Sequence, residues 1–194
     1  RFSECIRDDL IENVLKNIVS DYHIVYASSD FAREMCNPYY TDFMILGGHN
    51  RLRTRNLASL MEHVYMGAGI ISAKWVPHHL SDFHPLFGVH VSGEARGHNN
   101  FTVEIVESSL SGKGEIETAG SLNCIAVGTD TTVAGWFRQN GRCICRCGKH
   151  HTERACPAIV LNEYGGGKAV YFAFNPGMSL SEDNAAKMGG LLQS

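Results

Sequence analysis

The stretch Met66-Gly-Ala-Gly-Ile-Ile-Ser-Ala-Lys-Trp75 decides the fold class of this 194-residue chain. Its centre, Gly69-Ile-Ile-Ser72, is a short apolar run after a glycine, which is typical of a strand buried on both faces of a parallel sheet. A second run of this kind, Phe43-Met-Ile-Leu46, lies upstream and ends at two glycines. Between the runs, apolar side chains at helical spacing indicate a helix: Leu57, Leu60, Met61, Val64 and Tyr65. Strand, helix and strand in this order predict a βαβ unit.

The residues before this unit continue the alternation of helices and strands. Apolar positions at helical spacing predict an amphipathic helix over residues 4–20, and a run of β-forming residues predicts a strand over residues 23–27. Ser29-Asp30 is a candidate N-cap for a brief helix over residues 30–36. The first 75 residues are therefore predicted to form a doubly wound α/β sheet.

After Trp75 the pattern changes to strands separated by turns. The runs 101–106, 124–127 and 131–134 are strand-like, with Gly, Ser, Asn and Asp between them. Residues 158–161 and 169–174 flank Tyr164-Gly-Gly-Gly167 and predict a hairpin, and a last helix is expected over residues 181–192. We therefore predict one α/β domain over residues 1–194. Its sheet is expected to be doubly wound and mainly parallel, with antiparallel strand additions in the second half.

Composition sets aside two classes of protein. Seventeen Lys and Arg against 20 Asp and Glu give a formal net charge of −3, which is not the charge of a nucleic-acid-binding protein. No stretch reaches the ~18 apolar residues of a membrane span, so we expect no membrane insertion by this chain. The chain begins at Arg1 without a Met and close to a predicted helix, which indicates a piece of a larger protein. The other domains of that protein are its expected partners, and the sequence sets no oligomeric state.

Three short patterns carry a family resemblance. The run 43–48 ends in a glycine pair, the run 70–75 is a strand that ends in a sharp turn, and the run 171–177 is an apolar strand that ends in Asn-Pro-Gly. Together they resemble the class I glutamine amidotransferase-like superfamily, which has a flavodoxin-like α/β fold. They are similar in particular to its non-catalytic relatives, such as the middle domain of some β-galactosidases. The resemblance covers nearly the whole chain and implies a bacterial protein.

The resemblance also implies that the catalytic groups are missing. In the family, the second pattern carries the nucleophilic cysteine, whose position aligns with Lys74. In the third pattern, Asn175 stands in place of the catalytic His and Gly177 in place of the Glu. Thiol catalysis needs a thiolate, a base and a group that orients the base. We therefore expect no enzymatic activity and a structural or interaction role within the larger protein.

The carboxyl ends of the predicted strands define a candidate ligand site. In an open parallel sheet, ligands bind where the loops after these ends meet, which here gathers polar side chains at one rim: His49, Lys74, His78, His79 and Asn175. The β-galactosidase relatives suggest a carbohydrate, with Trp75, Phe83 and Phe87 as rings for stacking. The alternative is a rim that is merely solvated. Ser72 lacks the flanking glycines of a nucleophile elbow, so a hydrogen bond to the backbone is its simpler role.

The segment 141–156 is the sharpest local anomaly, because four cysteines and two histidines fall within 14 residues. If residues 142–147 are extended, the alternating geometry puts Cys143, Cys145 and Cys147 on one face. There they could share a zinc ion, or an iron–sulfur cluster, with His151 or Cys156. The competing interpretations are free thiols or a disulfide between Cys147 and Cys156 that closes a surface hairpin. Apart from this zinc alternative we expect no cofactor.

The other histidines and cysteines form no recognised ligand pattern. Five histidines fall within 21 residues, and we interpret them as solvated side chains of a polar loop, with a divalent metal site as the alternative: His78, His79, His84, His90 and His98. Cys5, Cys36 and Cys124 lie in or beside predicted core segments, where cysteine behaves as a small hydrophobe. Seven cysteines leave at least one thiol unpaired within the chain. The count leaves the compartment open, and an extracytoplasmic or cell-surface location is favoured.

Overall fold

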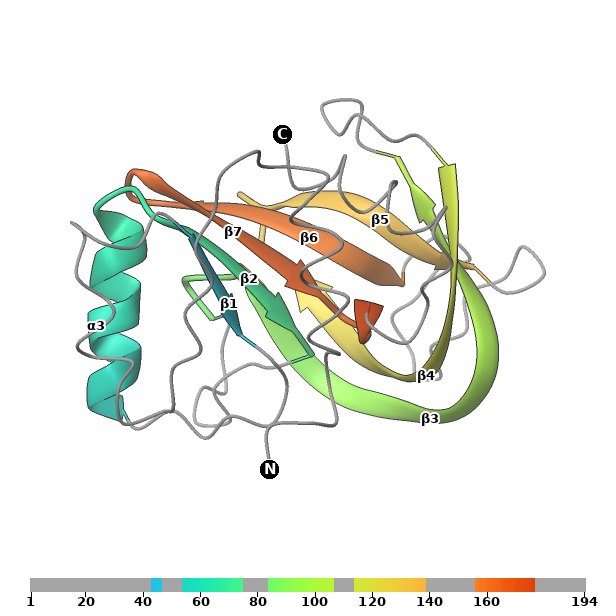
Figure 1. Ribbon diagram of the computed structural model, residues 1–194. Coiled ribbons are helices and arrows are strands. Elements are labelled where there is room, and N and C mark those ends of the chain that lie inside the picture. Colours follow the sequence, from blue (N-terminus) through green and yellow to red (C-terminus); the bar gives the residue numbers. More distant parts are fainter. Residues whose placement is uncertain (1–42, 47–53, 75–83, 107–113, 139–155, 177–194) are drawn as a thin grey trace, which may run out of the picture.

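The computed structural model describes residues 43–46, 54–74, 84–106, 114–138 and 156–176 of the chain. Within these ranges it has one helix and seven strands: β1 (Phe43–Leu46), α3 (Thr54–Tyr65), β2 (Gly69–Ala73), β3 (Val89–Ile105), β4 (Gly114–Val127), β5 (Thr132–Arg138), β6 (Pro157–Tyr164) and β7 (Gly167–Phe172). The strands form a single sheet in the order β1-β2-β7-β6-β5-β3-β4 (Figure 1). In this part of the chain no helix is long and apolar enough to cross a membrane.

Three neighbouring strands at one side of the sheet run parallel. β1 pairs with β2 from Phe43 opposite Gly69, and β2 pairs with β7 from Gly69 opposite Lys168. Helix α3 lies between β1 and β2 in the sequence and places Leu60 and Val64 in the core. The two strands and the helix predicted here from apolar periodicity are confirmed.

The other strand pairs are antiparallel and belong to the second half of the chain. β6 and β7 form a hairpin that closes at Tyr164 opposite Gly167, which confirms the predicted turn. β5 pairs with β6 and with β3, and β3 pairs with β4. β3 and β4 are 17 and 14 residues long and form a strongly curved hairpin (Figure 1). Its pairing shifts register between Val91 and Gly93, and such irregularities bend strands and increase their twist.

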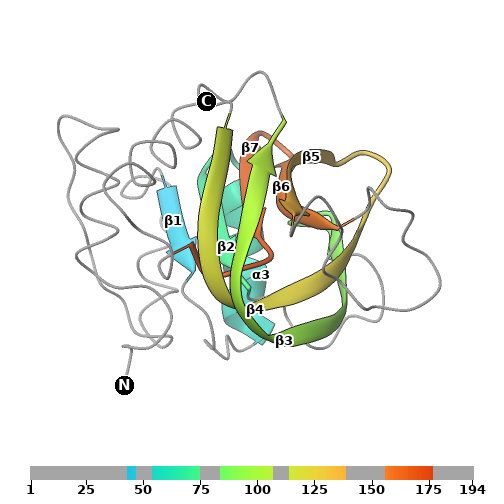
Figure 2. The ribbon, with the colours of Figure 1, turned by 90° about the vertical axis from the view of Figure 1, so that its right-hand side faces the viewer.

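The curvature brings the edge strand β4 back to the end of β7. Leu122 and Phe174 form an antiparallel bridge, and the N–H of Asn123 donates to the carbonyl oxygen of Ala173 at 2.6 Å. Figure 2, which views the molecule from the side of the β3–β4 hairpin, shows β3 and β4 in front of β2 and β7. In the described part of the chain, the sheet therefore covers its own inner face, as in a partly closed barrel.

The predicted doubly wound, mainly parallel α/β sheet is wrong, and so is the flavodoxin-like, amidotransferase-like fold class that it implied. Four of the six strand pairings are antiparallel, and the described residues contain a single helix. The reason lies in residues 89–127, where strands alternate between the core and the solvent. Phe101, Val103 and Ile105 are buried, and Thr102 and Glu104 between them are partly exposed. The elements predicted at 4–20, 23–27, 30–36 and 181–192 lie outside the described residues.

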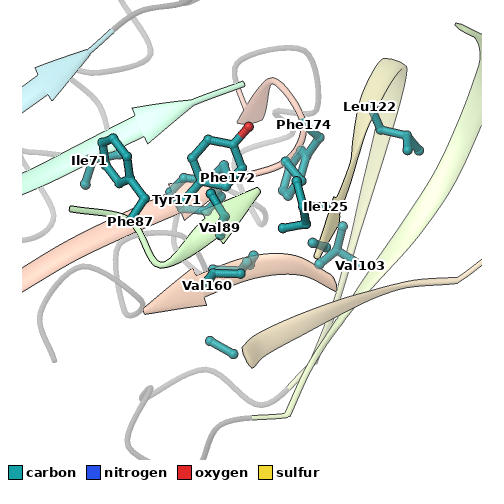
Figure 3. Close-up of a cluster of buried hydrophobic side chains, with 14 of the residues drawn as sticks. Ile71, Phe87, Val89, Val103, Leu122, Ile125, Val160, Tyr171, Phe172 and Phe174 are labelled. Atoms are coloured by element: carbon teal, nitrogen blue, oxygen red, sulfur yellow. The ribbon is translucent and has the colours of Figure 1, made fainter. Parts of the chain in front are cut away.

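Aromatic rings fill the space that the curved sheet encloses. Phe101 of β3, Phe137 of β5 and Phe174 contact one another edge to face, with ring centroids 5.1–6.1 Å apart. Phe172 packs on Phe174 in the same way at 5.7 Å. Figure 3 shows Phe172 and Phe174 in the buried cluster with side chains of β3 and β4. Each such ring pair adds about 0.5–1.5 kcal/mol beyond the area it buries, so the rings stabilise the curved form of the sheet.

The tip of the β6–β7 hairpin lies against the end of α3. The N–H of Gly166 donates to the carbonyl oxygen of Tyr65 at 2.8 Å. A Cβ atom on Gly167 would lie 2.1 Å from the carbonyl oxygen of Val64 and 2.3 Å from that of Ala68. Both are backbone atoms, which move only if the helix or the following turn moves. Position 167 therefore requires glycine.

We predict that Gly167→Ala lowers the free energy of unfolding by about 3 kcal/mol, because the added methyl group forces α3 and β7 apart. Gly93→Ala is the matched control, since a Cβ there meets nothing within 4 Å. The control should change the free energy of unfolding by less than about 0.5 kcal/mol. Urea unfolding followed by circular dichroism measures both. Equal stability of the two variants would contradict the close contact at position 167.

Candidate functional site

Lys74 stands at the carboxyl end of β2 in an unusual backbone conformation. Its φ is +58°, and among the described residues it is the one non-glycine residue with a positive φ. Its N–H donates to the carbonyl oxygen of Phe172 at 2.8 Å, and its carbonyl oxygen accepts from Asn123 Nδ2 at 2.9 Å. A left-handed conformation costs a non-glycine residue about 1–2 kcal/mol. These two hydrogen bonds hold the turn in that conformation, and such strained positions cluster at functional sites.

The side chain of Lys74 reaches across to the β3–β4 hairpin. Nζ donates to Glu94 Oε1 of β3 at 2.9 Å and to Ser121 Oγ of β4. The side chains of Lys74 and Glu94 are 21% and 32% exposed, so the ion pair is partly shielded from water. The amine of Lys74 is therefore engaged by both a carboxylate and a hydroxyl.

Asn123 connects the Lys74 turn to the core. Its side-chain nitrogen donates both to the carbonyl oxygen of Lys74 and to the hydroxyl of Tyr171, at 2.8 Å for the second bond. Burial raises the pKa of Tyr171 well above its ordinary value, and the hydrogen bond from Asn123 partly opposes this effect. The phenol therefore stays neutral at physiological pH. We call Lys74, Glu94, Ser121, Asn123 and Tyr171 the Lys74 site.

The structure describes two of the five predicted rim residues. Lys74 follows β2 and Asn175 follows the end of β7, and these two strands pair with each other in parallel. His49, His78 and His79 lie outside the described residues, as do Trp75 and Phe83. Phe87, the third ring proposed for sugar stacking, is fully buried and presents no face to a ligand. Ser72 is also fully buried, which agrees with a structural role.

Of the metal ligands predicted in the segment 141–156, Cys156 is the one that lies in the described part of the chain. It is buried and disulfide-bonded, and a disulfide sulfur is not a thiolate ligand. Cys143, Cys145, Cys147 and His151 lie outside that part. Within it, no three His, Cys, Asp or Glu side chains are grouped so that they could hold a metal ion.

Two further interpretations of single residues need correction. Cys124 is buried as predicted, but it is disulfide-bonded rather than a free hydrophobe. His84, interpreted from the sequence as a solvated loop residue, is only 1% exposed.

Two residues of the Lys74 site cannot be recognised from the sequence, and a third can be recognised only in part. Glu94 and Ser121 lie 20 and 47 positions from Lys74, and they reach it only because the β3–β4 hairpin curves back. Asn123 does leave a trace, because it is a polar residue at the start of the apolar run Leu122-Asn-Cys-Ile-Ala-Val127. A buried amide in such a run needs hydrogen-bond partners, which it finds in Lys74 and Tyr171.

Comparison with known proteins gives matches in structure. No protein-family model and no curated protein sequence matches the chain. The β-galactosidase of Rahnella sp. R3 matches with a TM-score of 0.57 and 17% identity over 79% of this chain. A cytoplasmic protein of Salmonella typhimurium matches with a TM-score of 0.63 and 14% identity, over 94% of this chain and 84% of that protein. The α-L-fucosidase isoenzyme 2 of Paenibacillus thiaminolyticus matches with a TM-score of 0.59 and 16% identity over 95% of this chain.

These matches establish a shared fold and nothing finer, because the identities are low. The chain spans about a fifth of the length of the β-galactosidases that it matches, 22% for the Rahnella enzyme. It spans 28% of the fucosidase. The same fold thus occurs as one part of much longer glycosidases and as most of a short protein.

We predict that Lys74→Gly is more stable than Lys74→Ala by about 1 kcal/mol. Both variants lose the contacts with Glu94 and Ser121, so the difference isolates the cost of the positive φ, which glycine does not bear. At Lys168, an exposed lysine that pairs with β2 and β6 as the second residue of β7, the order should reverse in the control pair Lys168→Gly and Lys168→Ala. Thermal and urea unfolding of the four variants tests this, and the same order at both positions would refute a strained turn.

We also predict that Asn123 and Tyr171 are energetically coupled. Asn123→Ala leaves the buried hydroxyl of Tyr171 without this donor, and an unsatisfied buried group costs about 1–3 kcal/mol. In the background of Tyr171→Phe that hydroxyl is absent, so Asn123→Ala should cost about 1 kcal/mol less there. A double-mutant cycle of unfolding free energies gives this difference. Strict additivity would mean that the hydrogen bond contributes nothing to stability.

Proposed function

We propose that this chain is a non-catalytic structural or interaction domain of a larger bacterial protein. The observation that carries the proposal is the ion pair of Lys74 with Glu94 at the end of β2. A strained turn at the end of a buried strand is the position where a nucleophile would be presented, and here the side chain at that position is engaged by two neighbours.

The chemistry of the Lys74 site supports this proposal. Ser121 and Lys74 form the hydrogen bond of a Ser–Lys pair, in which a neutral amine would have to take the proton from the hydroxyl. Glu94 Oε1 accepts from that amine at 2.9 Å in an ion pair, so the amine is not free to act on the hydroxyl. Asn175 carries an amide, which accepts no proton at neutral pH. The contacts of Lys74 with Glu94 and Ser121 therefore stabilise the packing of the β3–β4 hairpin against the end of β2.

The lengths of the matching proteins support a role beside other domains. The β-galactosidase and the fucosidase are several times longer than this chain, and each includes this fold as a minor part. Partners in the larger protein would then be its other domains. The disulfide-bonded Cys124 and Cys156 support an oxidising, extracytoplasmic compartment, because structural disulfides persist there.

Carbohydrate binding at the rim of the sheet is the second candidate. It is supported by the names of the matching glycosidases and by the partial exposure of Lys74 and Glu94, whose polar groups could bind sugar hydroxyls. A bound ligand at a hundred times its dissociation constant adds ~2.7 kcal/mol to the stability of the folded state. A thermal-shift series with galactose, mannose and fucose separates this candidate from a purely structural domain.

We predict that the purified chain hydrolyses neither glutamine nor aryl β-galactosides, β-mannosides or α-fucosides above the buffer rate. The reason is that the amine of Lys74 is engaged in an ion pair with Glu94 and no further base contacts Ser121 in the Lys74 site. Release of ammonia and of nitrophenol measures the two kinds of reaction. Turnover that disappears in both Lys74→Met and Ser121→Ala would overturn the proposal. Turnover that persists in both variants would point to a contaminating enzyme.

A further inference from the structure

His84 is a buried imidazole in a tight turn at the entrance to β3. Its N–H donates to the carbonyl oxygen of Val89 at 2.8 Å, and its own carbonyl oxygen accepts from the N–H groups of Phe87 and Gly88. The ring packs beside that of Phe87, with centroids 5.5 Å apart, and is 1% exposed. Among the described residues, neither ring nitrogen finds a hydrogen-bond partner. A buried imidazole normally has at least one hydrogen-bond partner. The ring of His84 lacks one in the core and would gain one from water outside it.

A small set of polar contacts holds this turn in the core. Asn162 of β6 donates to the carbonyl oxygens of Pro85 and Leu86, each at 3.0 Å. The N–H of Gly128 donates to the carbonyl oxygen of Gly88 at 2.8 Å, and Gly88 has a φ of +62°. Leu86 and Phe87 are fully buried beneath these contacts. These hydrogen bonds lie outside the strand pairings of β3 to β7, so an opening of the turn 84–88 would break them without breaking those pairings.

The charged and titratable groups around the turn offer His84 no counter-ion in the described part of the chain. Asp130 lies two residues after Gly128, and Glu163 lies directly after Asn162; both are exposed. His90 follows Val89 on β3. Tyr171 packs on Phe87 with ring centroids 5.8 Å apart, and its hydroxyl accepts from Asn123. None of these groups hydrogen-bonds to the ring of His84.

Burial lowers the pKa of His84 from 6.5 to about 4. When the turn opens, the imidazole reaches water and regains its ordinary pKa. As pH falls below 6.5, the open form therefore binds a proton that the closed form does not. Opening becomes roughly tenfold more favourable per pH unit until about pH 4, where the closed form binds the proton too.

We propose that His84 is a pH sensor: uptake of one proton by its imidazole drives the turn 84–88 out of the core while Val89 and the rest of the curved β3–β4 hairpin stay folded. The opened turn exposes Leu86 and Phe87 and withdraws the ring that packs on Tyr171. Asn123 donates hydrogen bonds to both Tyr171 and Lys74. Opening of the turn therefore also removes a packing contact of Tyr171, a residue of the Lys74 site. This inference does not depend on the proposed function.

Hydrogen exchange of the full 194-residue chain tests the sensor. The protection factors of the Phe87 and Gly88 amides should fall roughly tenfold per pH unit between pH 6.5 and 4.5, and those in the β3–β4 ladder should not change. In His84→Leu, which keeps an apolar group in the core without a titrating ring, the protection factors should be independent of pH.

Other outcomes overturn the proposal. An equal loss of protection in the turn and in the ladder would mean that acid unfolds the whole domain. If the protection factors of the turn still fall with pH in His84→Leu, the proton binds to another group. If His84→Leu does not fold, the imidazole resonances of the unsubstituted chain decide, because titration of His84 near its ordinary pKa of 6.5 without loss of protection would also refute the sensor.

Discussion

The return of β4 to the end of β7 is the constraint on which the rest of the described structure depends. It consists of little more than the Leu122–Phe174 bridge and the bond from the Asn123 N–H to the Ala173 carbonyl oxygen. Its effect is large because it turns an open sheet into one that encloses its own core. Phe101 of β3, Phe137 of β5 and Phe174, two residues after β7, can then meet in a single cluster, which two flat layers would keep apart.

The same closure assembles the Lys74 site. The turn after β2 belongs to the parallel side of the sheet, and Glu94, Ser121 and Asn123 belong to the antiparallel hairpin. Closure brings the two sides within hydrogen-bond distance, so that a strained backbone and an ion pair stabilise each other. A site formed in this way is well ordered because four elements contribute to it. Most of its polar groups form hydrogen bonds with one another, which favours a structural role over a catalytic one.

The sequence was informative wherever structure depends on neighbours along the chain. Apolar runs located β1 and β2, helical spacing located α3, and three consecutive glycines located the β6–β7 turn. It misled where the outcome depends on distant pairing. The strand-like run at 101–106 is the last part of a much longer strand, whose earlier residues include Ser92, Gly93 and Glu94 and look like a loop. They become strand because β4 supplies backbone partners for them, and no local pattern records that partner. Glu94 and Ser121, the hydrogen-bond partners of Lys74, could not be predicted from the sequence for the same reason.

The position of β7 sets the order in which this sheet can be made. β7 pairs with β2 on one side and with β6 on the other, so within the sheet it is the strand that joins β1 and β2 to the antiparallel strands. During synthesis, β1, α3 and β2 leave the ribosome long before Lys168 does, and until then Gly69 has no neighbour on that side. The parallel pairing of β2 with β7 therefore forms only after β7 has been synthesised. The sheet is completed when nearly all of the described chain has been made.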